Sequence, residues 1–234
     1  APRINGGNNQ PPPPDDELEQ FNFDDPLIAC KHTDEGNGLR LVSRIQDTWR
    51  HTQSHGWLHY DRGAWLPANT EIDQEAAQML ETTQDIASGL IEAAVHLHDP
   101  ESEELDALGR RLFRFAHNCE NSPRFDRIAK RAEKHLEIDY ELFDTHKDLL
   151  IARNGAVNLQ TGELVPHSPN YYMTHRLDIN YEPDALAPRW NRFLLEIMCG
   201  DQDMVDYLQT LFGYAMTGET KESIVAVFHG GGAN

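Results

Sequence analysis

The stretch TEIDQEAAQMLETTQDIASGLIEAAVHL, residues 70–97, decides what kind of fold this chain adopts. Its apolar residues recur at the spacing of an α-helix and form one stripe, with Glu and Gln on the opposite side. The stripe consists of Met79, Ile86, Leu90, Ala94 and Leu97. This pattern predicts a long amphipathic helix that buries one face against other elements.

Two more helices are predicted directly after it. Asp99-Pro100 and Ser122-Pro123 each combine a capping residue with a proline that suits the first helical turn. The apolar positions that follow these two pairs are Leu105, Leu108, Leu112 and Phe115, and then Phe125, Ile128, Ala132 and Leu136. We therefore expect three consecutive helices over about residues 70–137.

Upstream, the sequence predicts one further helix. Thr33 suits the N-cap, and Leu39, Val42, Ile45 and Trp49 follow at helical spacing. This helix is expected to continue as far as Trp49.

The next segment, GWLHYDRGAW at 56–65, predicts a β-hairpin, because two short aromatic runs flank Asp61-Arg62-Gly63. Its aromatic side chains, Trp57, Tyr60 and Trp65, either stack on exposed bases or pack against a neighbouring helix. Packing is the expected role.

Downstream, LLIARNGAVNLQTGELVPH at 149–167 predicts a small β-meander with turns at Asn154-Gly155 and Thr161-Gly162. Helices are expected to begin at Pro188 and after Asp201, and the apolar, β-branched run 223–228 is typical of a strand. The predicted fold class is therefore α+β and mainly α-helical, with a small β-hairpin and a β-meander.

The composition indicates an acidic protein of the cytoplasm. The 234 residues are 39% hydrophobic and carry a net charge of −19, so the surface as a whole is not suited to nucleic-acid backbones. No stretch approaches the ~18–20 apolar residues of a membrane span, and the first residues lack the pattern of a secretory signal, so no membrane partner is expected. Three widely spaced cysteines favour a reducing compartment. Neither a C-x-x-C pair nor a recognisable catalytic frame occurs, so no metal ligand and no catalytic residue is predicted.

Residues 1–30 are predicted to be a disordered linker. The segment INGGNNQPPPPDDELEQ at 4–20 combines glycine and asparagine with four prolines and an acidic run. Such a segment either joins an upstream region or is a plain disordered tail.

The segment from Arg110 to Lys134 is basic although the chain as a whole is acidic, since it contains eight cationic and only three acidic residues. The cations are Arg110, Arg111, Arg114, Arg124, Arg127, Lys130, Arg131 and Lys134. The last four of these recur at i, i+3, i+4 and i+7, which places them on one helix face. This face either contacts a DNA backbone, or pairs with acids of a neighbouring subunit or of the same chain, or is simply solvated.

The last five residues follow the apolar run 223–228 and are glycine-rich. A phosphate-binding loop begins in this way, because its backbone N–H groups must crowd around phosphate oxygens. The candidate nucleotide-binding residues are Gly230, Gly231, Gly232, Ala233 and Asn234. The alternative is a flexible glycine-rich tail.

Six separated blocks of the chain together resemble the phage, plasmid and poxvirus primase–helicase family. They are TDEGNGLRL (33–41), GWLHYDRGAW (56–65), NGAVNLQTGELVPH (154–167), YEPDALAPRWNRFLLEI (181–197), GDQDMVDYLQTLFGYAMTG (200–218) and HGGGAN (229–234). In that family a loop of the form Gly-x-Gly-x-Asn-Gly-Lys-Ser follows a strand. Gly230, Gly232 and Asn234 match its first half.

The resemblance implies a domain organisation. Residues 1–30 would link to an upstream primase region, 31–187 would be the helicase-associated domain, and 188–234 would be a helical lead-in and the first strand of an α/β P-loop ATPase domain, cut off inside its Walker A loop. The family's full-length members are ATP-driven superfamily 3 DNA helicases that form rings, usually hexamers. ATP, Mg²⁺, DNA and self-association are therefore implied for the full-length protein, and no cofactor is expected for these residues alone.

These residues by themselves are expected not to hydrolyse ATP, because the Walker lysine and the Ser or Thr are absent from them. Their role would be to support assembly and to contact DNA or a partner. The alternative is a non-catalytic oligomerisation or partner-binding module. A third interpretation sets the family aside and takes the chain as an acidic, helix-rich protein without an assigned role.

Overall fold

The computed structural model describes residues 21–97, 101–120 and 122–229, except that the side chain of Ser122 is not described. The chain forms two compact units. The first contains the described residues up to Leu58 and then Pro67–Ile138, and the second contains His59–Leu66 and the described residues from Asp139 onward. The boundary expected between residues 187 and 188 therefore falls inside the second unit.

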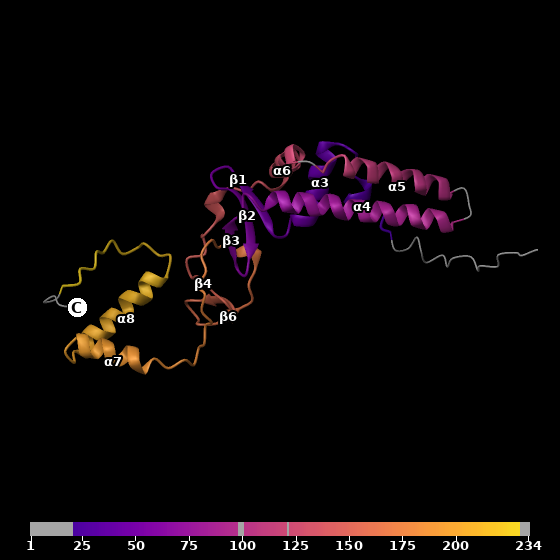
Figure 1. Cartoon of the computed structure of the whole chain (residues 1–234). Helices are drawn as coiled ribbons and strands as arrows, with labels where there is room; N and C mark the ends of the chain where they lie inside the picture. Colours follow the sequence, from indigo (N-terminus) through magenta and orange to yellow (C-terminus); the bar gives the residue numbers. More distant parts are fainter. Residues whose placement is uncertain (1–20, 98–100, 121, 230–234) are drawn as a thin grey trace, which may run out of the picture. The chain divides into compact units, whose positions relative to one another are not determined.

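Two long helices form the largest part of the first unit. Helices α4 (Ile72–His96) and α5 (Glu101–His117) run antiparallel and side by side (Figure 1). Met79, Leu90 and Ala94 of the predicted stripe are buried in α4, which confirms its amphipathic pattern. The predicted cap at Asp99 lies outside the described residues.

A second helix pair packs beside the first. Helices α3 (Asp34–Ile45) and α6 (Ser122–Leu136) share a core to which Leu41, Ile45 and Ile128 contribute. The Thr33 hydroxyl accepts a hydrogen bond from the Gly36 amide at 3.1 Å, so the predicted N-cap is confirmed. The third predicted helix is confirmed as well, although Ser122 already belongs to it.

The predicted extent of α3 was wrong at its C-terminal end. The helix ends at Ile45, and Trp49 begins strand β1 (Trp49–Thr52) instead of completing a fourth turn. Leu39, expected in the core, is 38% exposed, while Arg40 and Leu41 are fully buried. The face that packs is therefore rotated from the predicted one, because contacts with α2 and α6 select it.

Helix α2 (Pro26–Ala29) lies inside the range that we expected to be linker. The Asp25 carboxylate caps it by accepting from the Leu27 amide at 2.8 Å, and Leu27 and Ile28 are both buried. The linker prediction for residues 21–30 is thus corrected, because this short helix buries both of its large apolar side chains against the rest of the unit. Residues 1–20 lie outside the described residues.

The predicted hairpin supplies two of the strands of a three-stranded antiparallel sheet. Strands β1, β2 (Gly56–Asp61) and β3 (Ala64–Pro67) pair in sequence order. Arg62 and Gly63 both have positive φ angles in the β2–β3 turn, as a tight hairpin turn with the right-handed strand twist requires. Trp57 and Trp65 are 4% and 1% exposed, which confirms that both pack into a core.

The second unit contains the predicted meander. Strands β4 (Leu149–Ala152), β5 (Gly155–Asn158) and β6 (Leu164–Val165) form an antiparallel sheet, accompanied by two short 3₁₀ helices, η1 (Tyr140–Leu142) and η2 (Pro169–Tyr171). The indole N–H of Trp65 donates to the Pro169 carbonyl at 2.9 Å. Trp65 is therefore a core residue of this unit.

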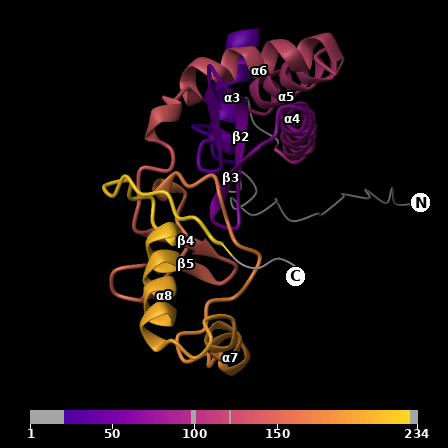
Figure 2. The same cartoon turned by 90° about the vertical axis from the view of Figure 1, so that its left-hand side faces the viewer.

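Helices α7 (Pro188–Ile197) and α8 (Gln202–Met216) follow as predicted and are visible in Figure 2. The Asp201 carboxylate caps α8 by accepting from the Met204 amide at 3.1 Å. Leu194, Val205 and Leu208 form the contact between the two helices.

The predicted strand over residues 223–228 does not form. Ile224, Val225, Val227 and Phe228 are 53–88% exposed, and no strand in the described part of the chain pairs with this segment. Without a neighbouring strand, the backbone N–H and C=O groups of such a segment bind water, and no inter-strand hydrogen bonds stabilise the extended conformation. The fold class is nevertheless confirmed as α+β and mostly helical, with two small three-stranded sheets.

Candidate nucleic-acid interface

The exposed face of α6 carries the predicted row of cations. The side chains of Arg127, Lys130, Arg131 and Lys134 are 60, 77, 54 and 53% exposed. The opposite face of the helix holds Ile128, Ala132 and Leu136 in the core. The apolar spacing therefore sets the orientation of α6 and turns the cations to solvent.

Carboxylates from the first turn of α3 lie against this row. Asp34 Oδ2 is 4.0 Å from Arg127 Nη1. Both oxygens of Glu35 are engaged: Oε1 is 2.5 Å from Lys134 Nζ, and Oε2 is 3.9 Å from Arg131 Nε. Intramolecular acids thus pair with the basic face, which was one of the three alternatives that the sequence left open.

Two further contacts complete the charge pattern around the row. His135 Nε2 lies 3.4 Å from Glu35 Oε1, and Lys130 Nζ lies 2.7 Å from Glu133 Oε2 on α6 itself. The hydrogen bond from Lys134 lowers the pKa of Glu35, with smaller contributions from His135 and Arg131. Glu35 is therefore ionised at neutral pH.

The other four cations have different surroundings. Arg110 donates to both Asp106 oxygens at 2.7 and 2.9 Å, and this pairing raises the pKa of its guanidinium. Arg124 Nη1 lies 3.1 Å from the Cys119 sulfur, and Arg114 is exposed. The predicted basic set is thus divided among several environments, and the continuous exposed row on α6 consists of Arg127, Lys130, Arg131 and Lys134.

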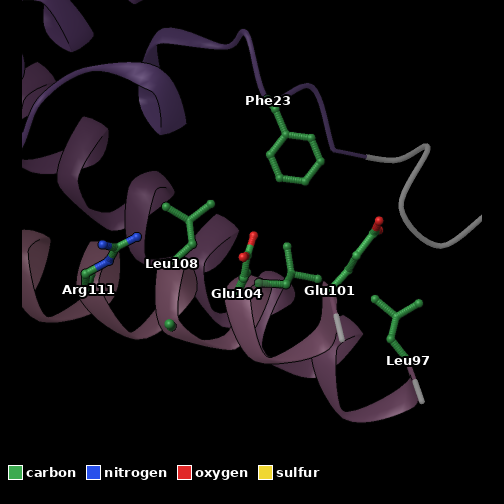
Figure 3. A pocket seen from close by; sticks show the side chains of 8 residues that line it. Phe23, Leu97, Glu101, Glu104, Leu108 and Arg111 are labelled. Atoms are coloured by element: carbon green, nitrogen blue, oxygen red, sulfur yellow. The ribbon is translucent and has the colours of Figure 1, made fainter. Parts of the chain in front are cut away.

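Arg111, the remaining cation, lines a cavity of about 610 Å³ at one end of the α4–α5 pair (Figure 3). Leu97, at the end of α4, and Leu108 of α5 supply apolar lining, and Glu104 of α5 also lines the cavity. Phe23 lies on the other side of the cavity, from the segment that we expected to be linker. This lining combines apolar side chains with charges of both signs, whereas a surface that binds a phosphate backbone is mainly positively charged.

The glycine-rich candidate residues 230–234 lie outside the described part of the chain, so the nucleotide-binding loop stays a prediction. Within residues 21–97, 101–120 and 122–229, no group of three or more His, Cys, Asp and Glu side chains is placed to hold a metal ion. In the same residues, no helix combines the length and the apolar character of a membrane span.

Sequence reasoning missed Asp34 and Glu35 as partners of the basic face. Their only local signal is a pair of acids after a capping threonine, which is typical of any helix N-terminus. They lie about 90–100 residues from their cationic partners in the chain, so their role depends on α3 and α6 packing together.

A protein-family match shows what this chain is similar to. Residues 38–199, more than half of the chain, match the family described as "D5 N terminal like". Among curated proteins no significant match to this chain is found. The matched range begins in α3, covers α4 to α6 and both sheets, and ends just after α7.

Proposed function

The chain belongs to the D5 N terminal like family, a domain found in primase–helicases of phages and viruses, and on this premise we propose that it serves as the helicase-associated domain of an ATP-driven DNA helicase. The match over residues 38–199 is the observation that carries the proposal. In this role the domain itself does no chemistry. It supports assembly of the helicase and contacts DNA or a partner protein.

The ATP-dependent part of the proposal rests on the glycine-rich residues Gly230, Gly232 and Asn234. They match the start of a Walker A loop, in which backbone N–H groups hold the triphosphate, and a lysine and a hydroxyl that follow contact phosphate and Mg²⁺. In this proposal the full-length protein binds ATP and Mg²⁺, assembles into a hexameric ring in the family's manner, and contains an upstream primase region.

DNA contact is assigned to the exposed row on α6. Arg127, Lys130, Arg131 and Lys134 follow one another along a single helix face, as contact with a phosphate backbone requires. The acidic remainder of the chain restricts such contact to this local surface.

A non-catalytic assembly module is the second candidate function, and a specific surface favours it. The Trp190 ring contacts the rings of Phe193 on α7 and Phe212 on α8, yet each of the three side chains is 39–48% exposed. Large aromatic side chains grouped on a surface are typical of protein–protein contact sites.

The test uses the intact gene product that contains these residues. It should separate a forked DNA duplex in the presence of ATP and Mg²⁺, and deletion of residues 38–199 should abolish unwinding. The 234-residue chain alone should release no phosphate from ATP with Mg²⁺ and single-stranded DNA, because it lacks the Walker lysine.

An intact product that carries no Gly-Lys-Ser or Gly-Lys-Thr after Asn234 and shows no ATP-dependent unwinding would overturn the helicase assignment. In that case, concentration-dependent self-association measured by light scattering would support the assembly module. ATP turnover by the pure chain would contradict the proposed lack of chemistry.

A further inference from the structure

The carboxylate of Glu35 lies among two cationic side chains and a histidine from the last turns of α6. Lys134 Nζ, His135 Nε2 and Arg131 Nε approach its two oxygens to 2.5, 3.4 and 3.9 Å. Asp34 extends the contact along the helix by reaching Arg127 at 4.0 Å. Two acids of α3 thus occupy the positions at which an external anion would meet this face.

The packing of α3 on α6 does not depend on these acids. Leu41, Ile128 and Ala132 are 0–1% exposed in the shared core. Gly38 allows a close backbone approach, because a Cβ added there would lie only 2.5 Å from the Cβ of Arg131. The apolar contact therefore holds the helices together, and the ion pairs lie outside it, at the solvent edge.

The ion pairs are also easily opened. The side chain of Glu35 is 42% exposed, and its partners Arg131 and Lys134 are more than half exposed, so water and salt screen the attraction. Long cationic side chains can turn from an exposed carboxylate to another anion at little cost. Pairing within the chain thus weakens the basic face without removing it.

DNA is the polyanion that can compete best for such a row. The span from Arg127 to Lys134 is about 10 Å at 1.5 Å per residue. Duplex DNA carries one charge per about 1.7 Å of axis, or roughly six phosphates over that length, and each contact also releases counterions. Two carboxylates at the solvent edge offer less charge and no counterion release.

We propose that Asp34 and Glu35 form an acidic clamp that mimics DNA phosphates, covers Arg127, Arg131 and Lys134 of the α6 row, and is displaced when DNA binds. The proposal rests on the proposed function for the identity of the polyanion. The clamp lowers the affinity of the free chain for DNA, and it makes binding depend on a multivalent backbone because single small anions do not displace both carboxylates.

The test measures binding of the full 234-residue chain to a short labelled DNA duplex by fluorescence anisotropy over a series of salt concentrations. The double variant Asp34→Asn with Glu35→Gln removes the clamp. Glu92→Gln is the matched control, because Glu92 is an exposed acid on α4 and its loss changes the net charge in the same direction. Thermal unfolding of each variant checks that the fold is kept.

Removing the clamp should tighten binding at low salt by about tenfold and steepen the slope of log affinity against log salt by about 1–2, as expected for one or two freed phosphate contacts. The Glu92→Gln control should stay within about twofold of the unchanged chain. Arg131→Glu with Lys134→Glu should abolish the gain when added to the double variant.

Equal binding by the double variant and the Glu92→Gln control, or a gain that survives the two charge reversals on α6, would refute the clamp. Absence of DNA binding by every variant, the clamp-free one included, would also refute it. The helicase assignment is judged separately by unwinding with the intact gene product, so the two proposals can fail independently.

Discussion

Replacing Arg40 by methionine tests how the first unit is held together. Arg40 is fully buried, and its guanidinium donates to the carbonyls of Leu27, Cys30 and Lys31 and to the Asn37 side-chain oxygen. The three carbonyls lie at the C-terminal end of α2, so one side chain of α3 satisfies the end of a neighbouring helix. Burial lowers the pKa of this guanidinium, which stays protonated.

The Arg40→Met change keeps an apolar stem and removes every donor. The Leu27 carbonyl and the Asn37 oxygen are buried, so leaving either one unpaired lowers the free energy of unfolding by about 1–3 kcal/mol. The other two acceptors are only partly buried and can bind water, and removing a buried charge returns part of its desolvation cost. We expect a net loss of about 2–4 kcal/mol, which lowers Tm by about 5–15 °C.

The assay is thermal unfolding followed by tryptophan fluorescence and circular dichroism, together with hydrogen exchange of the peptide that covers residues 26–30. Arg44→Met is the matched control, because Arg44 lies on the same helix, is exposed and donates only to Thr82. It should change the free energy of unfolding by no more than about 0.5 kcal/mol. In Arg40→Met, α2 should exchange its amide protons faster than in the control.

The reasoning would be refuted if Arg40→Met and Arg44→Met had the same melting temperature and the same exchange over residues 26–30. That result would mean that water replaces the guanidinium at all four acceptors without loss. Docking of α2 would then rest on Leu27 and Ile28 alone.

Two other predictions test helix packing and pH dependence. Gly109→Ala should lower the free energy of unfolding by about 1–3 kcal/mol, because the added Cβ would lie 2.8 Å from Ile91 Cγ1. In the control Gly213→Ala the added Cβ would meet nothing within 4 Å, so that change should be neutral or stabilising. Equal melting temperatures of the two variants would contradict this packing argument. The hydrogen bond from Arg176 lowers the pKa of Asp61, so the pair stabilises the second unit above the ordinary aspartate pKa and this contribution is lost as pH falls through the lowered value. Asp61→Asn should remove that acid-side loss of stability, and an ordinary Asp61 pKa in an NMR titration would count against it.

The helices were predictable because their signals are local. The apolar spacing from Met79 to Leu97 and the caps Thr33 and Asp201 act within a few residues of one another, and the structure keeps them. The meander was predictable for the same reason, since turns at fixed sites separate short apolar runs. Two of the blocks that indicated the family, 33–41 and 56–65, likewise lie in one capped helix and in one hairpin.

The errors occurred where a residue depends on distant partners. Trp49 continues a helical spacing but joins a strand, because β2 offers it a sheet and a core. The run 223–228 has the composition of a strand, yet no described segment pairs with it. In both cases local preference was weaker than the presence or absence of a partner.

The sequence by itself determined the number and order of the main helices, the meander and the likeness to a replication family, because periodicity, capping and turn chemistry are properties of neighbouring residues. Only the tertiary structure decided that Arg40 closes the end of α2 and that Glu35 lies against Arg131 and Lys134. These contacts join positions far apart in the chain. They form because the packing of apolar helix faces brings the charged and polar groups within reach of one another.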